Sequence, residues 1–268
     1  MFQVVFGSSA IFHSFTPDGS QDDTSETGVE EAKCQIKKGD VLPGDYEVLS
    51  DAVYGGMGKV WHVHQRNKNR DLAMKQPQLR GTEERKNRQK ERFIKAHQNW
   101  IELGQCPDIV SCYEVTDIDG VPTAFSEWME GGSLREKIHD GSLYQDHGLW
   151  QRVLRTAIQI ARGLEFAHSK NVIHCDIKPA NILFTADGTV KINDFSLALF
   201  KDSDEGGPSG YTPQYCSTEQ QEGLTPEPKQ IFIPVRLRFW RYSSAADRGE
   251  QALKLQSSLT SILHRAAS

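Results

Sequence analysis

The chain has 268 residues, of which 25% are charged and 37% are hydrophobic, a composition typical of a folded protein with a sizeable core. No apolar run reaches the roughly eighteen residues of a membrane-spanning helix, and no Lys or Arg precedes Lys33 to start a signal peptide, so we expect a cytoplasmic location. The formal net charge is −5; because the last forty residues contribute +5 (seven Lys or Arg, two Asp or Glu), the first 228 carry −10, which argues against nucleic-acid binding.

Residues 1–40 are predicted to form a disordered leader. The stretch from Thr16 to Glu31 is rich in Asp, Ser, Thr, Gly and Glu and has few apolar side chains to bury.

Three strands are predicted next, at Tyr46–Leu49, Lys59–His64 and Asp71–Lys75. The glycine-rich turn from Gly55 to Gly58 is not a Walker loop, because Val60 stands where that motif needs Ser or Thr. It is not a dinucleotide fingerprint either, because a strand rather than a helix follows it. A hairpin that covers nucleotide phosphates fits best.

Two histidines, His62 and His64, share one face of the second strand. Such a pair could bind a metal. Since no third ligand lies nearby, we favour a solvated strand face over a metal site.

A helix is predicted from about Thr82 to Leu103, with Glu83 and Glu84 in its first turn, where the helix dipole favours anions. Its apolar face consists of Phe93, Ala96, Trp100 and Leu103. Two more strands, Ile109–Glu114 and Pro122–Phe125, complete a five-stranded antiparallel sheet. A short helix at Leu134–His139 and a buried helix at Trp150–Ser169 follow.

The stretch from Val172 to Ser196 carries most of the polar chemistry. The dipeptide Asp187-Gly188 between two apolar runs predicts a hairpin with a two-residue turn. That turn would place Asn181 opposite Asp194, and the amide and carboxylate oxygens together would suit Mg²⁺.

Several motifs in this half of the chain resemble those of a known family. His174–Asn181, which reads His-Cys-Asp-Ile-Lys-Pro-Ala-Asn, resembles the catalytic loop of protein kinases, and Asp194-Phe-Ser resembles their metal-binding Asp-Phe-Gly. The resemblance runs from Tyr46 to Gln221, and Lys178 and Thr212 match the serine/threonine class, of the bacterial type. An ordinary hairpin with surface polar residues is the alternative, and it leaves the order of the motifs unexplained.

The resemblance implies a fold and a division of the chain. The fold is a two-lobed α+β kinase domain with a small antiparallel sheet and one helix in the first lobe. That lobe would span residues 41–129 and an incomplete, mainly helical second lobe residues 130–225.

The resemblance also implies roles for individual residues. Asp176 would accept the proton of the substrate hydroxyl, Lys178 would steady the transferred phosphate, and Asn181 and Asp194 would hold Mg²⁺. The ATP-binding residues would be Val53, Gly55, Gly58, Val60, Ala73, Lys75, Glu127, Met129 and Leu183. Ser126 would be a small residue behind the adenine.

Four positions depart from the family pattern. Ala96 stands where the family has a Glu that pairs with the strand lysine, so we expect Lys75 to lack that partner. Cys175 replaces an Arg that receives a regulatory phosphate, Ser196 replaces a Gly, and Val53 replaces the first glycine of the hairpin.

Residues 226–268 form a divergent basic tail that does not continue the resemblance. We expect a shifted reading frame or a truncation near Gln221, with a genuine basic interaction tail as the alternative.

The function that this sequence predicts is Mg²⁺-dependent transfer of the ATP γ-phosphoryl group to Ser or Thr of a protein substrate. A nucleotide-binding pseudokinase that acts as a scaffold, and a non-functional kinase fragment, are the alternatives.

Overall fold

The computed structural model describes residues 36–55, 58–144, 149–200, 212 and 218–222, all within the unit Ile36–Ser268. The expected leader up to residue 35 and the basic tail from residue 226 lie outside the described residues. None of the helices in the described ranges combines the length and the apolar character needed to cross a membrane.

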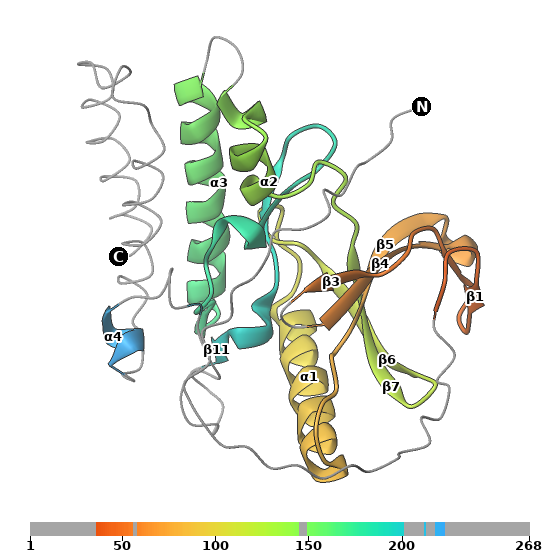
Figure 1. Ribbon diagram of the computed structural model, residues 1–268. Coiled ribbons are helices and arrows are strands. Elements are labelled where there is room, and N and C mark those ends of the chain that lie inside the picture. The colour runs from red at the N-terminus through yellow and green to blue at the C-terminus, as the bar shows by residue number, and fades with distance from the viewer. Residues whose placement is uncertain (1–35, 56–57, 145–148, 201–211, 213–217, 223–268) are drawn as a thin grey trace, which may run out of the picture. The chain divides into compact units, whose positions relative to one another are not determined.

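An antiparallel sheet with one long helix makes up the first part of the chain (Figure 1). The sheet order is β1-β2-β4-β5-β7-β6, and β3 also pairs with β4. The strands are β1 (Val41–Leu42), β2 (Tyr46–Val48), β3 (Val53–Gly55), β4 (Gly58–Gln65), β5 (Arg70–Gln76), β6 (Cys112–Ile118) and β7 (Val121–Glu127). The five predicted strands are confirmed, and the short strands β1 and β3 are additional.

One predicted strand starts later than expected. Ile109 does not join β6 but forms a parallel bridge with Ile192 from the second part of the chain. The Val110 N–H donates to the Ile192 carbonyl and the Ile192 N–H to the Asp108 carbonyl, each at 2.9 Å. This short segment therefore ties the two parts of the chain together.

Side chains alternate across the sheet as a period of two requires. On β4, Trp61 and Val63 are buried and pack with Leu72, Met74 and Phe125, whereas His62 and His64 are only half-buried. The two histidines therefore lie on the face of the sheet opposite to this buried cluster.

Helix α1 (Glu83–Leu103) begins at Thr82, whose side chain accepts a hydrogen bond from the Arg85 N–H. Its buried face contains Phe93, Trp100 and Leu103, as predicted. Ala96 is only half-buried, and His97 is buried in its place. Successive residues of an α-helix are about 100° apart around its axis. A modest rotation of the helix about this axis therefore decides whether Ala96 or His97 is the buried residue.

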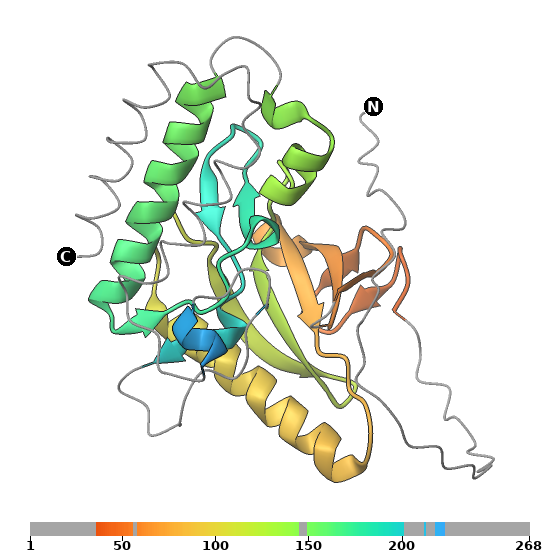
Figure 2. The same cartoon turned by 60° about the vertical axis from the view of Figure 1, so that its left-hand side comes forward.

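The second part of the chain is mainly helical. Its helices are α2 (Leu134–His139), α3 (Leu149–Ser169) and α4 (Thr218–Gln221), with the 3₁₀ turns η2 (Ser142–Tyr144), η3 (Pro179–Asn181) and η4 (Phe195–Leu197); η1 (Arg66–Lys68) lies in the sheet region. The strands β8 (Val172–Ile173) and β11 (Leu199–Phe200) pair with each other, as do β9 (Ile182–Phe184) and β10 (Val190–Ile192). Figure 2 shows α3 beside the β9–β10 hairpin, against which it packs.

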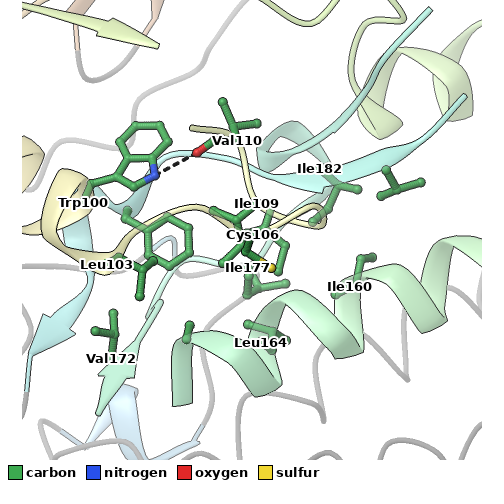
Figure 3. Packing of buried hydrophobic residues seen from close by; sticks show 14 of the residues in the cluster. Trp100, Leu103, Cys106, Ile109, Val110, Ile160, Leu164, Val172, Ile177 and Ile182 are labelled. Atoms are coloured by element: carbon green, nitrogen blue, oxygen red, sulfur yellow. Dashed lines mark hydrogen bonds between the residues drawn. The ribbon is translucent and has the colours of Figure 1, made fainter. Parts of the chain in front are cut away.

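A single apolar cluster joins α1 to the second part of the chain (Figure 3). Trp100 from α1 donates its indole N–H to the Val110 carbonyl at 3.0 Å. Ile160 and Leu164 from α3 approach the same cluster from the other side. Helix α1 and the loop that contains Cys175 and Ile177 therefore share one core.

The β9–β10 hairpin differs from the prediction in its register. Ile182 faces Ile192 and the Asn193 N–H donates to the Asn181 carbonyl, so Asn181 lies opposite Asn193 and not opposite Asp194. The loop has three residues between Thr185 and Thr189, and only Gly188 has a positive φ, of 84°. A three-residue loop that ends in a left-handed glycine is a common alternative to the two-residue turn, which the dipeptide alone does not exclude.

Gly163, in the middle of α3, lies against the segment that joins the two parts of the chain. A Cβ at this position would lie 2.8 Å from the Asp108 carbonyl oxygen and 2.9 Å from Ile192 Cδ1. We predict that Gly163→Ala lowers the free energy of unfolding by about 1–2 kcal/mol, although Ala favours helix by about 1 kcal/mol over Gly.

Urea denaturation of the purified chain measures this change. Glu165→Ala, at an exposed position of the same helix, is the control and should change the stability by less than about 0.5 kcal/mol. A Gly163→Ala variant as stable as the unmodified chain would contradict the close contact.

Candidate active site

The loop between β8 and η3 is held by a buried histidine. His174 Nε2 donates to the Asn193 carbonyl at 2.9 Å, and Nδ1 accepts from the Asp176 N–H at 3.2 Å. Burial lowers the pKa of His174, which keeps the imidazole neutral and lets Nδ1 act as an acceptor. The loop turns at Cys175, which has a left-handed φ of 60°. His174 therefore fixes the direction in which Asp176 leaves the loop.

Four side chains converge at the end of this loop. Asp176 Oδ2 accepts from Lys178 Nζ at 2.6 Å and from Asn181 Nδ2 at 3.1 Å, and Oδ1 accepts from the Thr212 hydroxyl at 2.6 Å. Lys178 Nζ also donates to the Thr212 hydroxyl at 2.9 Å. The structure thus brings the predicted residues Asp176, Lys178 and Asn181 together and adds Thr212, which the sequence indicated only as a class marker.

The amide of Asn181 is oriented by the same loop. Its Nδ2 donates to the backbone carbonyl of Asp176 at 2.9 Å as well as to the carboxylate. Since the NH₂ group takes up both of these bonds, the carbonyl oxygen Oδ1 is the atom of this side chain that is suited to a cation.

A second acid, Asp194, pairs with a lysine of the sheet. Lys75 Nζ lies 2.8 Å from Asp194 Oδ1, and both side chains are 16% exposed. Burial alone would raise the pKa of Asp194, but the Lys75 ammonium outweighs it and holds this pKa well below its usual range. Asp194 has a left-handed φ of 63°, after which Phe195 is fully buried.

The ring of Phe195 packs between the two halves of the site. It meets the His174 ring edge-on, with centroids 4.6 Å apart, and the Trp100 ring at 5.9 Å. Phe195 therefore links the loop at His174 to α1 and fixes the backbone at Asp194.

Helix α1 supplies no carboxylate to Lys75. The nearest acids in its sequence, Glu91 and Glu102, are both exposed, and Ala96 presents a methyl group. Within the described residues, Asp194 is the one acid that forms an ion pair with Lys75.

The residues expected to bind nucleotide lie on adjacent strands and at the end of β7. Val60 pairs with both Val53 and Lys75, Gly55 pairs with Gly58, and Ala73 pairs with Ser126. Position 58 also requires glycine for packing, because a Cβ there would lie 2.1 Å from the Gln76 carbonyl oxygen.

The other three expected nucleotide residues lie at the end of β7, just after it, and on β9. Both carboxylate oxygens of Glu127 accept from Lys191 Nζ, at 2.6 and 2.8 Å, and the Glu127 N–H donates to the Ser111 carbonyl at 2.9 Å. Met129 is buried in the core, and Leu183 is half-buried on β9, where it bridges to Ser133.

The two histidines of β4 share a carboxylate that the sequence analysis did not consider. His62 Nε2 lies 3.0 Å and His64 Nδ1 2.6 Å from the two oxygens of Asp71, and the His62 ring stacks on Trp128 with centroids 4.0 Å apart. Across the described ranges, no group of three or more His, Cys, Asp or Glu side chains is arranged to hold a metal.

Gln220 is a site residue that sequence reasoning missed. Its Nε2, on α4, donates to the backbone carbonyl of Cys175 at 2.8 Å, and the residue is buried. This bond supports the loop just before Asp176. No local pattern distinguishes Gln220 from the neighbouring Gln221, so only the tertiary structure reveals it.

The Lys75–Asp194 pair leads to a testable prediction about stability. Lys75→Met should lower the free energy of unfolding at pH 7 by about 3 kcal/mol, because a buried carboxylate loses its partner. The control is Lys86→Met, which removes an exposed pair with Glu83 and should change stability by less than about 0.5 kcal/mol.

The pH dependence of this effect follows from the pKa of Asp194. In the unmodified chain the depressed pKa stabilises the fold above the unfolded value of about 3.9, and this contribution is lost as the pH falls below it. In Lys75→Met burial raises the pKa of Asp194, so stability is lost as the pH rises through that value. The deficit measured by urea denaturation should therefore shrink as the pH falls from 7 to about 4; a constant deficit over this whole range would contradict the pairing.

Comparisons with known proteins identify the family. Residues 46–224 match the model of the protein kinase domain. The chain is 34% identical to a probable serine/threonine-protein kinase of Streptomyces coelicolor over 196 residues, which are 68% of this chain and 27% of the relative. It is 31% identical to the serine/threonine-protein kinase PknB of Mycobacterium leprae over 191 residues, 68% of this chain and 29% of the relative.

A probable serine/threonine-protein kinase of Clostridium perfringens is similar to a comparable degree, with 30% identity over 188 residues that cover 69% of this chain and 26% of the relative. The chain thus spans less than a third of the length of these curated relatives. The matched range includes the sheet from β2 onward, α1, the loop His174–Asn181 and Asp194. On these grounds the chain belongs to the protein kinase family.

Proposed function

We propose that this chain transfers the γ-phosphoryl group of ATP to a Ser or Thr hydroxyl of a protein substrate, with Mg²⁺. The observation that carries the proposal is the convergence of Lys178, Asn181 and Thr212 on the buried carboxylate of Asp176. Under this proposal residues 41–129 and 130–225 are the two lobes of the kinase domain.

Asp176 is the group that receives the substrate hydroxyl. Its Oδ1 already accepts a hydrogen bond from the Thr212 hydroxyl at 2.6 Å. This contact supports the view that an aliphatic hydroxyl fits beside the Asp176 carboxylate. A base within hydrogen-bond distance of the proton orients the attacking oxygen and takes up its proton. Lys178, at 2.6 Å from Asp176, supplies positive charge next to the transferred phosphoryl group.

The side chains of Asn181 and Asp194 are suited to hold Mg²⁺. Asn181 keeps its amide oxygen available, and the depressed pKa of Asp194 keeps that carboxyl ionised at neutral pH. Two protein oxygens are the usual share for Mg²⁺, which completes its shell with water and phosphate oxygens. When bound, the ion neutralises charge on the phosphates.

Lys75 and the glycine-rich hairpin are the groups that position the nucleotide. Lys75 pairs with Val60 in the sheet, and its ammonium group forms an ion pair with Asp194. In this proposal it binds the α and β phosphates, while Val60, Ala73 and Leu183 enclose the adenine.

Asp176→Asn tests the transferase function. Labelling of dephosphorylated casein from γ-labelled ATP and Mg²⁺ should fall by at least about 10²-fold, because the amide cannot accept the proton. Asp187→Asn, in the exposed hairpin loop, is the matched control and should leave labelling unchanged. Equal labelling by the unmodified chain and Asp176→Asn would overturn the assignment.

A nucleotide-binding scaffold is the second candidate function, and the methyl group of Ala96 on α1 favours it. This function predicts that a non-hydrolysable ATP analogue raises the melting temperature only when Mg²⁺ is present, while casein remains unlabelled. Asp194→Asn should abolish the dependence on Mg²⁺. A melting temperature that neither ligand changes would exclude both candidate functions.

A further inference from the structure

His97 on α1 carries a buried nitrogen without a hydrogen bond. Its Nδ1 lies 2.8 Å from the backbone carbonyl of Phe93, and since a carbonyl only accepts, Nδ1 carries the proton. Nε2 is then a lone-pair acceptor, and it has no partner among the residues that the structure describes. An unsatisfied buried polar atom is unfavourable and calls for an explanation.

The environment of His97 keeps this acceptor neutral. Burial, and after it the nearby Lys75 ammonium, lower the pKa of His97 to about 4, while Phe93 and Asp194 act in the opposite direction. The ring lies 4.0 Å from Phe93 and 5.9 Å from Trp100, centroid to centroid. At neutral pH His97 is therefore an uncharged imidazole, fixed by two aromatic rings, within electrostatic range of Lys75.

Lys75 has the donors that match this acceptor. An ammonium group has three N–H donors, and within the described part of the chain only Asp194 Oδ1 accepts one of them. Lys75 and Asp194 are both mostly buried, so water satisfies the remaining donors poorly. The His97 ring lies 5.9 Å from the Trp100 ring, which in turn lies 5.9 Å from the ring of Phe195, the residue after Asp194. The remaining donors of Lys75, paired with Asp194, and the acceptor of His97 therefore lie in the same buried region.

We propose that His97 is a positioning residue that takes the place of the missing α1 carboxylate, and that its Nε2 accepts a hydrogen bond from Lys75 when Lys75 leaves Asp194. The inference rests on the proposed function, because in the nucleotide-bound form Asp194 would hold Mg²⁺. His97 touches neither the substrate nor the reacting atoms and acts by orienting Lys75.

The first test needs no nucleotide and no activity. The Nε2 resonance of His97 is followed by ¹⁵N NMR in the Asp194→Asn variant, in which the neutral amide weakens the hold on Lys75. We expect an upfield shift of Nε2, as for an imidazole nitrogen that becomes a hydrogen-bond acceptor. Adding Lys75→Met should reverse this shift, and a shift that persists without the ammonium would overturn the proposal.

The second test is a double-mutant cycle on binding of a non-hydrolysable ATP analogue with Mg²⁺, measured by calorimetry. His97→Phe keeps the aromatic packing and removes Nε2; it should raise the Kd about tenfold in the unmodified background and less than about twofold with Lys75→Met. His97→Gln, which returns an acceptor, should restore the Kd to within about threefold. Trp100→Phe is the packing control and should act equally in both backgrounds.

The outcomes separate the two proposals. An equal rise of Kd on His97→Phe with and without Lys75→Met would make His97 a packing residue and overturn the inference. If the unmodified chain binds no nucleotide, the proposed function fails. The NMR comparison in the nucleotide-free protein still decides whether His97 accepts from Lys75.

Discussion

The ion pair between Lys75 and Asp194 is the interaction on which the arrangement of the site depends. It joins residues 119 positions apart, one on the central strand β5 and the other at the start of η4. A buried pair of this kind stays in place only if both backbones are fixed, because its desolvation is unfavourable. Pairing with β4 and β7 fixes Lys75, and the burial of Phe195 against His174 fixes Asp194.

Much of the fold could be predicted from the sequence because its signals are local. Alternation of apolar residues indicated the five strands, and the spacing of Phe93, Trp100 and Leu103 indicated α1. The cluster around Asp176 was predictable for a different reason. Asp176, Lys178 and Asn181 lie within six residues of one another, so one short loop brings them together whatever the rest of the chain does.

The predicted hairpin register and the predicted buried face of α1 were wrong at positions where a shift by one residue decides the structure. The Asp187-Gly188 dipeptide is compatible with a loop of two or three residues, and the longer loop moves Asn181 from Asp194 to Asn193. On α1 a similar ambiguity hid the burial of His97, because the predicted apolar face included its neighbour Ala96 instead. Contacts across long separations in sequence, such as that of Gln220 with Cys175, leave no pattern in a single sequence.

Under the proposed function, the lack of an α1 carboxylate paired with Lys75 within the described residues changes the balance between the free and nucleotide-bound forms. A carboxylate on α1 would compete with Asp194 for Lys75, whereas the methyl group of Ala96 and the uncharged imidazole of His97 compete weakly. Lys75 and Asp194 therefore pair with each other in the free protein, and under the proposed function a nucleotide would have to separate them. The apparent affinity falls by the fraction of molecules in which the pair is open, about tenfold for each 1.4 kcal/mol of pair stability. Under the proposed function, the contact that stabilises the free site thus also sets an upper limit on its affinity for ATP.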